Sequence, residues 1–229
     1  MKRVLIFQAI LALTIISIFP TQETRANDPQ KLIEDAAALA KSLLTDPKWS
    51  AYRTHFKQAK GIILAPDVIR AGLVVGGSGG QCIVLARKTS VDGWSSPSFC
   101  AIGEATIGLQ IGFEKLEVML LVMNDNALAR IAAGTATLGG EAGMSVGLIG
   151  STIESASTPT MDFDVELLAF ARGQGLYGGV TLDGGYIGPD NTYNHAYYGQ
   201  KVAAEEILFQ HKVNSPHTNM LHDALLSGE

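Results

Sequence analysis

Two glycine-rich runs hold the residues best placed to support chemistry. The first, residues 76–80, reads Gly-Gly-Ser-Gly-Gly and fits the pattern Gly-x-Ser-x-Gly, in which a strand, a sharp turn and a helix expose a nucleophilic serine, here Ser78. The residues that follow, 81–85, form an apolar, strand-like run and do not indicate the required helix. We therefore interpret the run as a bend between two strands, and a serine hydrolase using Ser78 is a remote alternative.

The second run, residues 173–178, reads Gly-Gln-Gly-Leu-Tyr-Gly and matches the dinucleotide-binding pattern Gly-x-Gly-x-x-Gly. That chemistry requires a helix whose N-terminus holds the phosphate, within a strand–helix–strand unit. The next residues, Gly-Val-Thr-Leu, favour a strand instead. No cofactor is expected.

Three histidines in the C-terminal segment, His211, His217 and His222, precede Asp223. Their irregular spacing does not match the regular spacing of structural metal sites, so we expect no metal. With no catalytic constellation elsewhere, the sequence indicates a protein that is not an enzyme.

The two cysteines, Cys82 and Cys100, flank a predicted β-hairpin whose turn lies near Val91, the midpoint between them. In this arrangement the two side chains lie opposite each other across the ladder. A disulfide is the favoured interpretation in an oxidising compartment, with free thiols as the alternative.

The segment from Pro97 to Asn126 dominates the middle of the chain. Its first half alternates apolar and small residues with a period of two, and its last part is the apolar run Val118 to Met123. We expect two strands joined by a turn at Glu114 and Lys115, the second of them buried at the centre of a sheet.

The remaining patterns complete an α+β fold. Helices are expected over 29–44, within 49–59, and over 125–133, 190–198 and 202–209; strands are expected over 61–64, 71–75, 81–87, 164–172 and 176–182, with one or two more in 135–150. Residues 151–160 are rich in Ser and Thr and read as a loop. Together these predict one domain over residues 27–210, a curved antiparallel sheet or partial barrel with helices at both ends, followed by a polar tail over residues 211–229.

The first expected helix carries a broad apolar stripe, with charged residues on its other face. The residues assigned to a possible lipid contact are the apolar Leu32, Ile33, Leu39, Leu43 and Leu44 and the basic Lys31 and Lys41. Such a stripe is more often packed on a core, whereas a membrane-surface helix normally has a more basic polar face. Both interpretations stay open.

The charge and the N-terminus limit the function further. The formal net charge of −5 argues against nucleic-acid binding through a general basic surface. Residues 1–26 resemble a secretory signal peptide, with Lys2 and Arg3 before an apolar run and small residues at Thr24 and Ala26 before the expected cleavage point. We expect a periplasmic or secreted protein, possibly peripheral on an envelope membrane.

Several blocks in this order resemble one family. They are residues 59–66 (AKGIILAP), 72–87, 93–99 (GWSSPSF), 108–112 (GLQIG), 120–125 (LLVMND), 175–180 (GLYGGV) and 196–199 (AYYG). This series, over about residues 30–208, is similar to the SYLF domain family, including its exported bacterial members.

The resemblance implies a domain that is not an enzyme and that binds membrane phospholipid. Eukaryotic members bind phosphoinositides, partly through an amphipathic N-terminal helix, and some bind actin. The helix of this chain has only Lys31 and Lys41 as basic groups, so lipid contact through it would depend mostly on apolar burial. A structural or protein-interaction module of the envelope, with no lipid contact, is the second hypothesis.

Overall fold

The computed structural model describes residues 28–47, 53–72, 75–88, 93–107, 112–139, 143–149, 165–175 and 184–228. Its helices are α2 (Pro29–Leu44), α3 (Arg53–Gln58), α4 (Asp125–Ala132), α5 (Asn191–Tyr198), α6 (Ala204–Leu208) and α7 (Thr218–Leu226). Its strands are β1 (Gly61–Gly72), β2 (Val75–Ala86), β3 (Ser98–Ile107), β4 (Gly112–Val122), β5 (Ala136–Thr137), β6 (Val146–Ile149), β7 (Leu167–Gly175) and β8 (Tyr186–Pro189).

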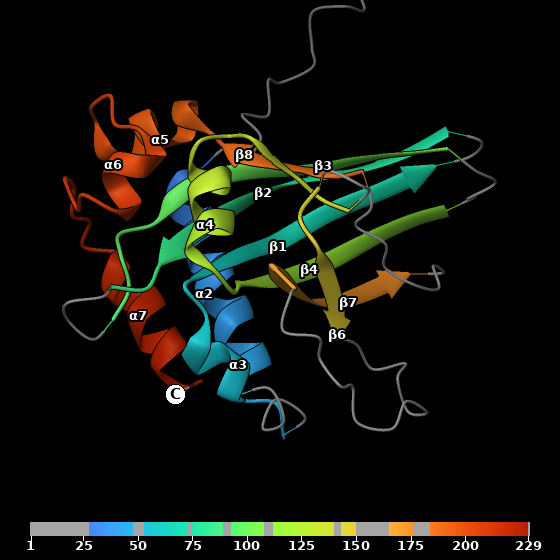
Figure 1. The fold of residues 1–229 in the computed structure, drawn as a ribbon, viewed down its shortest axis with the longest axis horizontal. Coiled ribbons are helices and arrows are strands. Elements are labelled where there is room, and N and C mark those ends of the chain that lie inside the picture. The colour runs from blue at the N-terminus through green and yellow to red at the C-terminus, as the bar shows by residue number, and fades with distance from the viewer. Residues whose placement is uncertain are drawn as a thin grey trace, which may run out of the picture.

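The strands form one curved sheet of eight strands in the order β5-β8-β3-β2-β1-β4-β7-β6 (Figure 1). All neighbouring pairs are antiparallel except β6 and β7, which are parallel. The prediction of an α+β fold built on a curved antiparallel sheet, with helices near both ends of the chain, is confirmed.

Helices cover both faces of the sheet. Side chains of a strand point alternately to opposite faces, so neighbouring residues of one strand pack against different helices. On β1, Ile62 and Leu64 pack in a core with α2, α3 and α7, whereas Ile63 and Ala65 pack in a second core with α4 and α6. The labelled strands β1, β2, β3 and β4 extend beyond the helices to one side (Figure 1). The helices are therefore concentrated at one end of the sheet.

Helix α2 begins and ends where the sequence predicts. The Asp28 side chain accepts a hydrogen bond from the backbone N–H of Gln30, and Pro29 occupies the first turn, where its missing N–H costs nothing. The apolar stripe then packs on the sheet, and the helix ends at Leu44. A cap, a proline and a stripe define this element locally.

The predicted break between strands 61–64 and 71–75 and the predicted bend at the glycine run 76–80 are both wrong. β1 continues from Gly61 to Gly72 through Pro66, with a shift in register between Leu64 and Asp67 that marks a bulge. A bulge tolerates proline, which has no N–H to give to the ladder. β2 likewise runs through Gly76–Gly80 without a break. At Gly80 a Cβ would lie 2.3 Å from the Asp67 carbonyl oxygen, so glycine is required here by close packing against the bulge.

The predicted hairpin within 97–126 is also wrong. β3 pairs with β2 and β8, whereas β4 pairs with β1 and β7, so the hairpin of β1 and β2 lies between them. Glu114 and Lys115 lie inside β4 and form no turn. The prediction of a buried strand over Val118 to Met123 is confirmed as far as Val122, where β4 ends. A period of two identifies a strand but does not identify its neighbours.

The C-terminal segment is not a polar tail. Within it, α7 buries Leu221, Ala224 and Leu225 against the core that contains α2. These positions are spaced three and four apart, so they share one face of a helix, and the polar residues between them conceal the pattern in the sequence. The predicted loop over 151–160, the strand over 176–182 and the turn near 91 lie outside the described residues.

Candidate functional site

The apolar residues proposed for lipid contact on α2 lie in the core. Leu32, Ile33, Leu39 and Leu44 are 9%, 0%, 3% and 1% exposed, and Leu43 is half-buried against the same cluster. In this arrangement a bilayer cannot reach the stripe unless α2 leaves the sheet. That lipid contact stays a prediction, and the packing is the one expected of a helix that belongs to the core.

The two basic residues of this predicted site are both exposed but differ in their contacts. Lys31 is bound to Asp35 one turn along α2, with its Nζ 2.5 Å from Oδ1. The hydrogen bond to Asp35 is the main reason that the pKa of Lys31 is raised. Lys41 lies in the last turn of α2 and forms no ion pair with any residue that the structure describes. Only Lys41 is therefore open to an anionic partner.

Side chains from other elements hold α2 in place. Arg172 on β7 donates to the Ser42 hydroxyl at 3.1 Å and pairs with Glu117 on β4, with its Nη2 2.5 Å from Oε2. On another side, Leu221 and Leu225 of α7 belong to the same core cluster as the stripe. Moving α2 to a membrane would break all of these contacts.

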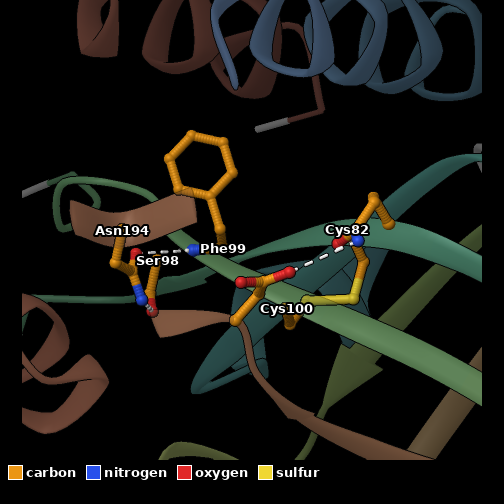
Figure 2. Close-up of a disulfide and its surroundings, with 7 residues drawn as sticks. Cys82, Ser98, Phe99, Cys100 and Asn194 are labelled. Carbon is orange, nitrogen blue, oxygen red and sulfur yellow. Dashed lines mark hydrogen bonds between the residues drawn. A yellow bond between two sulfur atoms is a disulfide. The ribbon is translucent and has the colours of Figure 1, made fainter. Parts of the chain in front are cut away.

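The two cysteines face each other across β2 and β3, as predicted. Cys82 and Cys100 are direct partners in the ladder, and the structure joins their sulfurs at 2.08 Å, with Cα atoms 4.8 Å apart (Figure 2). Beside them the Phe99 N–H donates to Asn194 Oδ1 at 3.0 Å, and Asn194 Nδ2 donates to the Ser98 hydroxyl at 3.4 Å (Figure 2). These bonds attach α5 to β3 beside the two cysteines, which are both buried.

Ser78 does not occupy a nucleophile elbow. It lies in the middle of β2, and no helix follows Gly80 because the strand continues to Ala86. Its hydroxyl donates to Glu104 at 3.4 Å, and Glu104 is also 3.5 Å from the Arg70 guanidinium in a buried ion pair. The serine is part of a polar row across the sheet. For the dinucleotide pattern, Gly173 and Gly175 lie in β7, and residues 176–178 lie outside the described part.

The C-terminal histidines make separate structural contacts. His217 Nδ1 is 3.1 Å from the Tyr197 hydroxyl, and His222 Nε2 is 3.3 Å from the Ser95 carbonyl oxygen. Across the residues that the structure describes, no group of three or more His, Cys, Asp or Glu side chains is arranged to hold a metal ion.

Sequence reasoning missed a cluster of basic residues around α3. We call it the basic pole and define it by five residues: Lys41, Arg53, Lys57, Lys60 and Lys88. All are exposed except Lys88, which is half-buried. None of the five forms an ion pair with a residue in the described ranges.

The fold brings the basic pole together from three segments. Arg53 and Lys57 are four residues apart on α3 and therefore share a face, while Phe56 between them is fully buried. The backbone N–H of Arg87, the residue before Lys88, donates to the Lys60 carbonyl oxygen at 2.8 Å. The last turn of α2 meets α3 through Leu44 and Phe56, which both lie against Gly228.

A signal for the basic pole was present in the sequence but was hidden by the total charge. Between residues 36 and 66 the only acid is Asp46, against five Lys or Arg residues, in a chain whose net charge is −5. Leu226, 61% exposed at the end of α7, adds an apolar side chain two residues from Gly228. The arrangement therefore presents free cations and one apolar group at the same end of the molecule.

Among the helices that the structure describes, none has the length and apolar character needed to cross a membrane.

The chain is similar to the proteins of one family. Residues 103–227, more than half of the chain, match the Ysc84 family, which is described as Las17-binding protein actin regulator. Over 154 residues it is 30% identical to LAS seventeen-binding protein 3 of Saccharomyces cerevisiae, covering 66% of this chain and 33% of that protein. Over 191 residues it is 31% identical to the SH3 domain-containing YSC84-like protein 1 of Rattus norvegicus and of Homo sapiens, covering 82% of this chain and 49% of each relative.

The chain thus spans between about a third and a half of the length of these curated relatives. The description of the family and the name of the yeast relative both refer to binding of Las17. The family model matches residues 103–227, and the relatives of 31% identity cover 82% of the chain, so this chain belongs to the Ysc84 family, the family of the SYLF domain.

Proposed function

We propose that this domain is not an enzyme and binds membrane phospholipid, with the basic pole facing anionic headgroups. The observation that carries the proposal is the presence of five cations with no ion-pair partner among the described residues, gathered at one end of a chain of net charge −5. The acidic remainder of the molecule is repelled by an anionic surface, so the charge distribution favours one orientation, with α3 toward the membrane.

The expected strength of this contact follows from simple electrostatics. Each Lys or Arg near an anionic leaflet contributes about 1 kcal/mol, so five cations contribute about 5 kcal/mol at most. Exposed charges are screened by salt within a Debye length of about 8 Å at physiological ionic strength. Binding by the basic pole is therefore moderate, reversible and sensitive to salt. Leu226 adds a small apolar contribution if it enters the interface.

Insertion of α2 is the less favourable route for the folded protein. It would expose the part of the core now covered by Leu32, Ile33, Leu39 and Leu44. Each buried leucine or isoleucine contributes about 1.5–3 kcal/mol relative to exposure. A bilayer would bury the side chains of the helix again, but the apolar face of the sheet would stay exposed to water. We therefore place the contact on the folded surface of the basic pole, which includes Lys41 of the originally predicted residues.

Co-sedimentation with lipid vesicles tests the proposal. The mature chain is compared with a triple variant, Arg53→Glu, Lys57→Glu and Lys60→Glu, on phosphatidylcholine vesicles with and without phosphatidylglycerol. A matched control reverses three other exposed lysines, Lys115→Glu, Lys201→Glu and Lys212→Glu, so both variants change the net charge equally. We expect salt-sensitive binding to the anionic vesicles only, with at least a tenfold loss in the first variant and retention in the control. Equal binding of both variants would remove the basic pole from the mechanism.

A second candidate is a protein-interaction module that makes no lipid contact. Two observations favour it: α2 is packed as a core helix, and the related yeast protein is named for binding LAS seventeen. This hypothesis predicts no co-sedimentation with any vesicle. Loss of binding to neutral and anionic vesicles alike, in a chain shown to be folded, would favour it over the lipid hypothesis.

We also propose that the protein is exported, with residues 1–26 removed, and that Cys82 and Cys100 are oxidised there. Closing a loop of 18 residues in sequence stabilises a fold by about 3 kcal/mol in the chain-entropy account. Mass spectrometry of the protein purified from its native cell tests both statements. The expected mass is that of a chain that begins at Asn27 and has two hydrogens fewer than the dithiol form. Two free cysteine thiols that react with an alkylating reagent would contradict the proposed oxidation of Cys82 and Cys100.

A further inference from the structure

A row of polar side chains crosses the sheet on the face that packs with α4 and α6. Its members are direct partners in neighbouring strands, in the order Glu104 of β3, Ser78 of β2, Arg70 of β1 and Glu114 of β4. Arg70 lies two residues after Val68 and Glu114 lies two residues before Leu116, and both apolar residues belong to that core. Alternate residues of a strand share a face, so the row continues the core along the strands. We call these four residues the polar row.

The two carboxylates of the polar row differ in their contacts. Glu104 accepts a hydrogen bond from the Ser78 hydroxyl and pairs with the Arg70 guanidinium. Glu114 is only 5% exposed, yet it forms no ion pair with any residue in the described ranges, and its buried Oε2 has no hydrogen-bond partner there. Burial of an ionised carboxylate is costly unless the group is paired, so Glu114 calls for a positively charged donor.

The Glu114 carboxylate lies against the backbone of β7 at an exposed glycine. A Cβ on Gly173 would lie 2.2 Å from Glu114 Oε1, so the carboxylate occupies space that any other residue would fill. Gly173 itself is exposed to solvent. The direct partner of Glu114 in β7 is a second glycine, Gly175. Two positions without side chains therefore give a small ligand a route to the carboxylate from the side of β7.

The basic residues next to this position on β4 and β7 do not neutralise it. Lys115 follows Glu114 in β4 and therefore points to the other face, where its Nζ lies 2.5 Å from Asp67 Oδ1. Arg172 precedes Gly173 in β7 and pairs with Glu117. Glu114 therefore keeps its charge available on the face that holds the polar row.

The charges of the polar row select a cation. The row holds two carboxylates and one guanidinium, which gives a net charge of −1, so an anion would be repelled. A metal ion fits poorly, because in the described part of the chain no three His, Cys, Asp or Glu side chains are arranged to hold one. A primary ammonium group carries one charge and three N–H donors, and it needs only one charged acceptor.

From this arrangement we propose that Glu114 binds the ammonium group of a small primary amine. The ammonium group donates to Glu114 Oε2 from the side of Gly173, while Arg70 stays paired with Glu104. The site lies on the opposite face of the sheet from α2 and α3, so it does not include the basic pole and does not rest on lipid binding.

Calorimetry and thermal unfolding of the mature chain with butylamine test the proposal. Tetramethylammonium has the same charge but no N–H donor, and butyrate has the opposite charge. We expect saturable binding of butylamine and a rise in melting temperature, at least tenfold weaker binding of tetramethylammonium, and none of butyrate.

Glu114→Gln keeps the shape of the side chain and removes its charge, so it should weaken butylamine binding at least tenfold. The matched control is Glu205→Gln, which makes the same charge change at an exposed glutamate on α6 and should not alter binding. Without amine, Glu114→Gln should be at least as stable as the wild type, because it removes a buried charge. Gly173→Ala should also weaken binding, since its Cβ displaces the carboxylate.

Three results would overturn the proposal. They are the absence of saturable butylamine binding at tens of millimolar, equal binding by the Glu114→Gln and Glu205→Gln variants, and a loss of stability in amine-free Glu114→Gln, which would show a structural role instead. Vesicle binding should be the same in all of these variants, so the amine site and the lipid contact fail independently.

Discussion

Arg87 lies over the indole of Trp94, with its guanidinium carbon 4.3 Å from the ring centroid. From this position it donates hydrogen bonds to the carbonyl oxygens of Ala59 at 3.0 Å and Phe56 at 2.8 Å, at the end of α3. A helix of six residues is not stable alone, so these contacts and the burial of Phe56 hold α3 against the sheet. The orientation of the basic pole therefore depends on Arg87.

Replacement of Arg87 by alanine should lower the free energy of unfolding by about 2–3 kcal/mol. The change removes a cation–π contact and leaves two carbonyl oxygens without their donor. Urea denaturation measures the loss, and Lys88→Ala, the neighbouring residue without such contacts, should change stability by less than about 0.5 kcal/mol. An equal effect of the two substitutions would show that Arg87 does not anchor α3.

Replacement of Leu39 by alanine tests whether α2 belongs to the core in solution. The side chain is 3% exposed, so we expect a loss of about 2–5 kcal/mol from the cavity and the lost burial. Leu226→Ala is the matched control, since that leucine is 61% exposed and should cost little. If thermal or urea denaturation gives the same small change for both, α2 is not packed on the sheet.

Alanine substitutions at two adjacent glycines in β2 should have different effects on stability. At Gly80 the new Cβ would lie 2.3 Å from the Asp67 carbonyl oxygen, and the backbone must move, at a cost of about 1–3 kcal/mol. At Gly79 the nearest atom, the Ile102 carbonyl oxygen, is 3.7 Å away, so alanine fits and should be neutral or slightly stabilising. Chemical denaturation of the two variants measures the difference. A Gly80→Ala variant as stable as Gly79→Ala would contradict the packing at the β1 bulge.

Stability should fall at alkaline pH, partly through Tyr198. Burial, with a smaller contribution from Tyr197, raises the pKa of Tyr198, whose hydroxyl donates to the Pro97 carbonyl oxygen at 2.6 Å. Because the unfolded chain releases this proton near pH 10 and the folded chain does not, the stabilisation is complete below about pH 10 and is lost as pH rises further.

Tyr198→Phe should therefore cost about 1 kcal/mol at neutral pH and make the alkaline decline less steep. Melting temperatures between neutral pH and pH 11 provide the measurement. Some slope should remain, because burial also raises the pKa values of Tyr193 and Tyr197. An identical slope in wild type and variant would exclude Tyr198 as a contributor.

Local signals in the sequence predicted the elements better than their arrangement. Asp28, Pro29 and the stripe of α2 define that helix almost to the residue, since cap, proline and spacing are all local. The pairing of β4 with β1, and not with β3, could not be predicted in this way, because strands that are distant in sequence pair through packing across the whole sheet. The β1 bulge at Pro66 and the buried face of α7 were missed for the same reason.

The candidate site shows the same division. The ladder position of Cys82 opposite Cys100 follows from hairpin symmetry and was predictable. The burial of Leu32 and Leu39 was not, because an amphipathic stripe looks the same whether it covers a sheet or a bilayer. The basic pole needs Lys60 and Lys88 to meet through β1 and β2, a contact that no single segment of sequence contains.

Hydrogen–deuterium exchange of the mature protein, with and without phosphatidylglycerol vesicles, tests the central claim most directly. If the folded surface of the basic pole faces the membrane, peptides covering α3 and residues 85–88 become more protected, while α2 keeps the slow exchange of a packed helix. Faster exchange in β1 and α7, which α2 would uncover by leaving, together with unchanged α3 would contradict the account and assign the lipid contact to the α2 stripe.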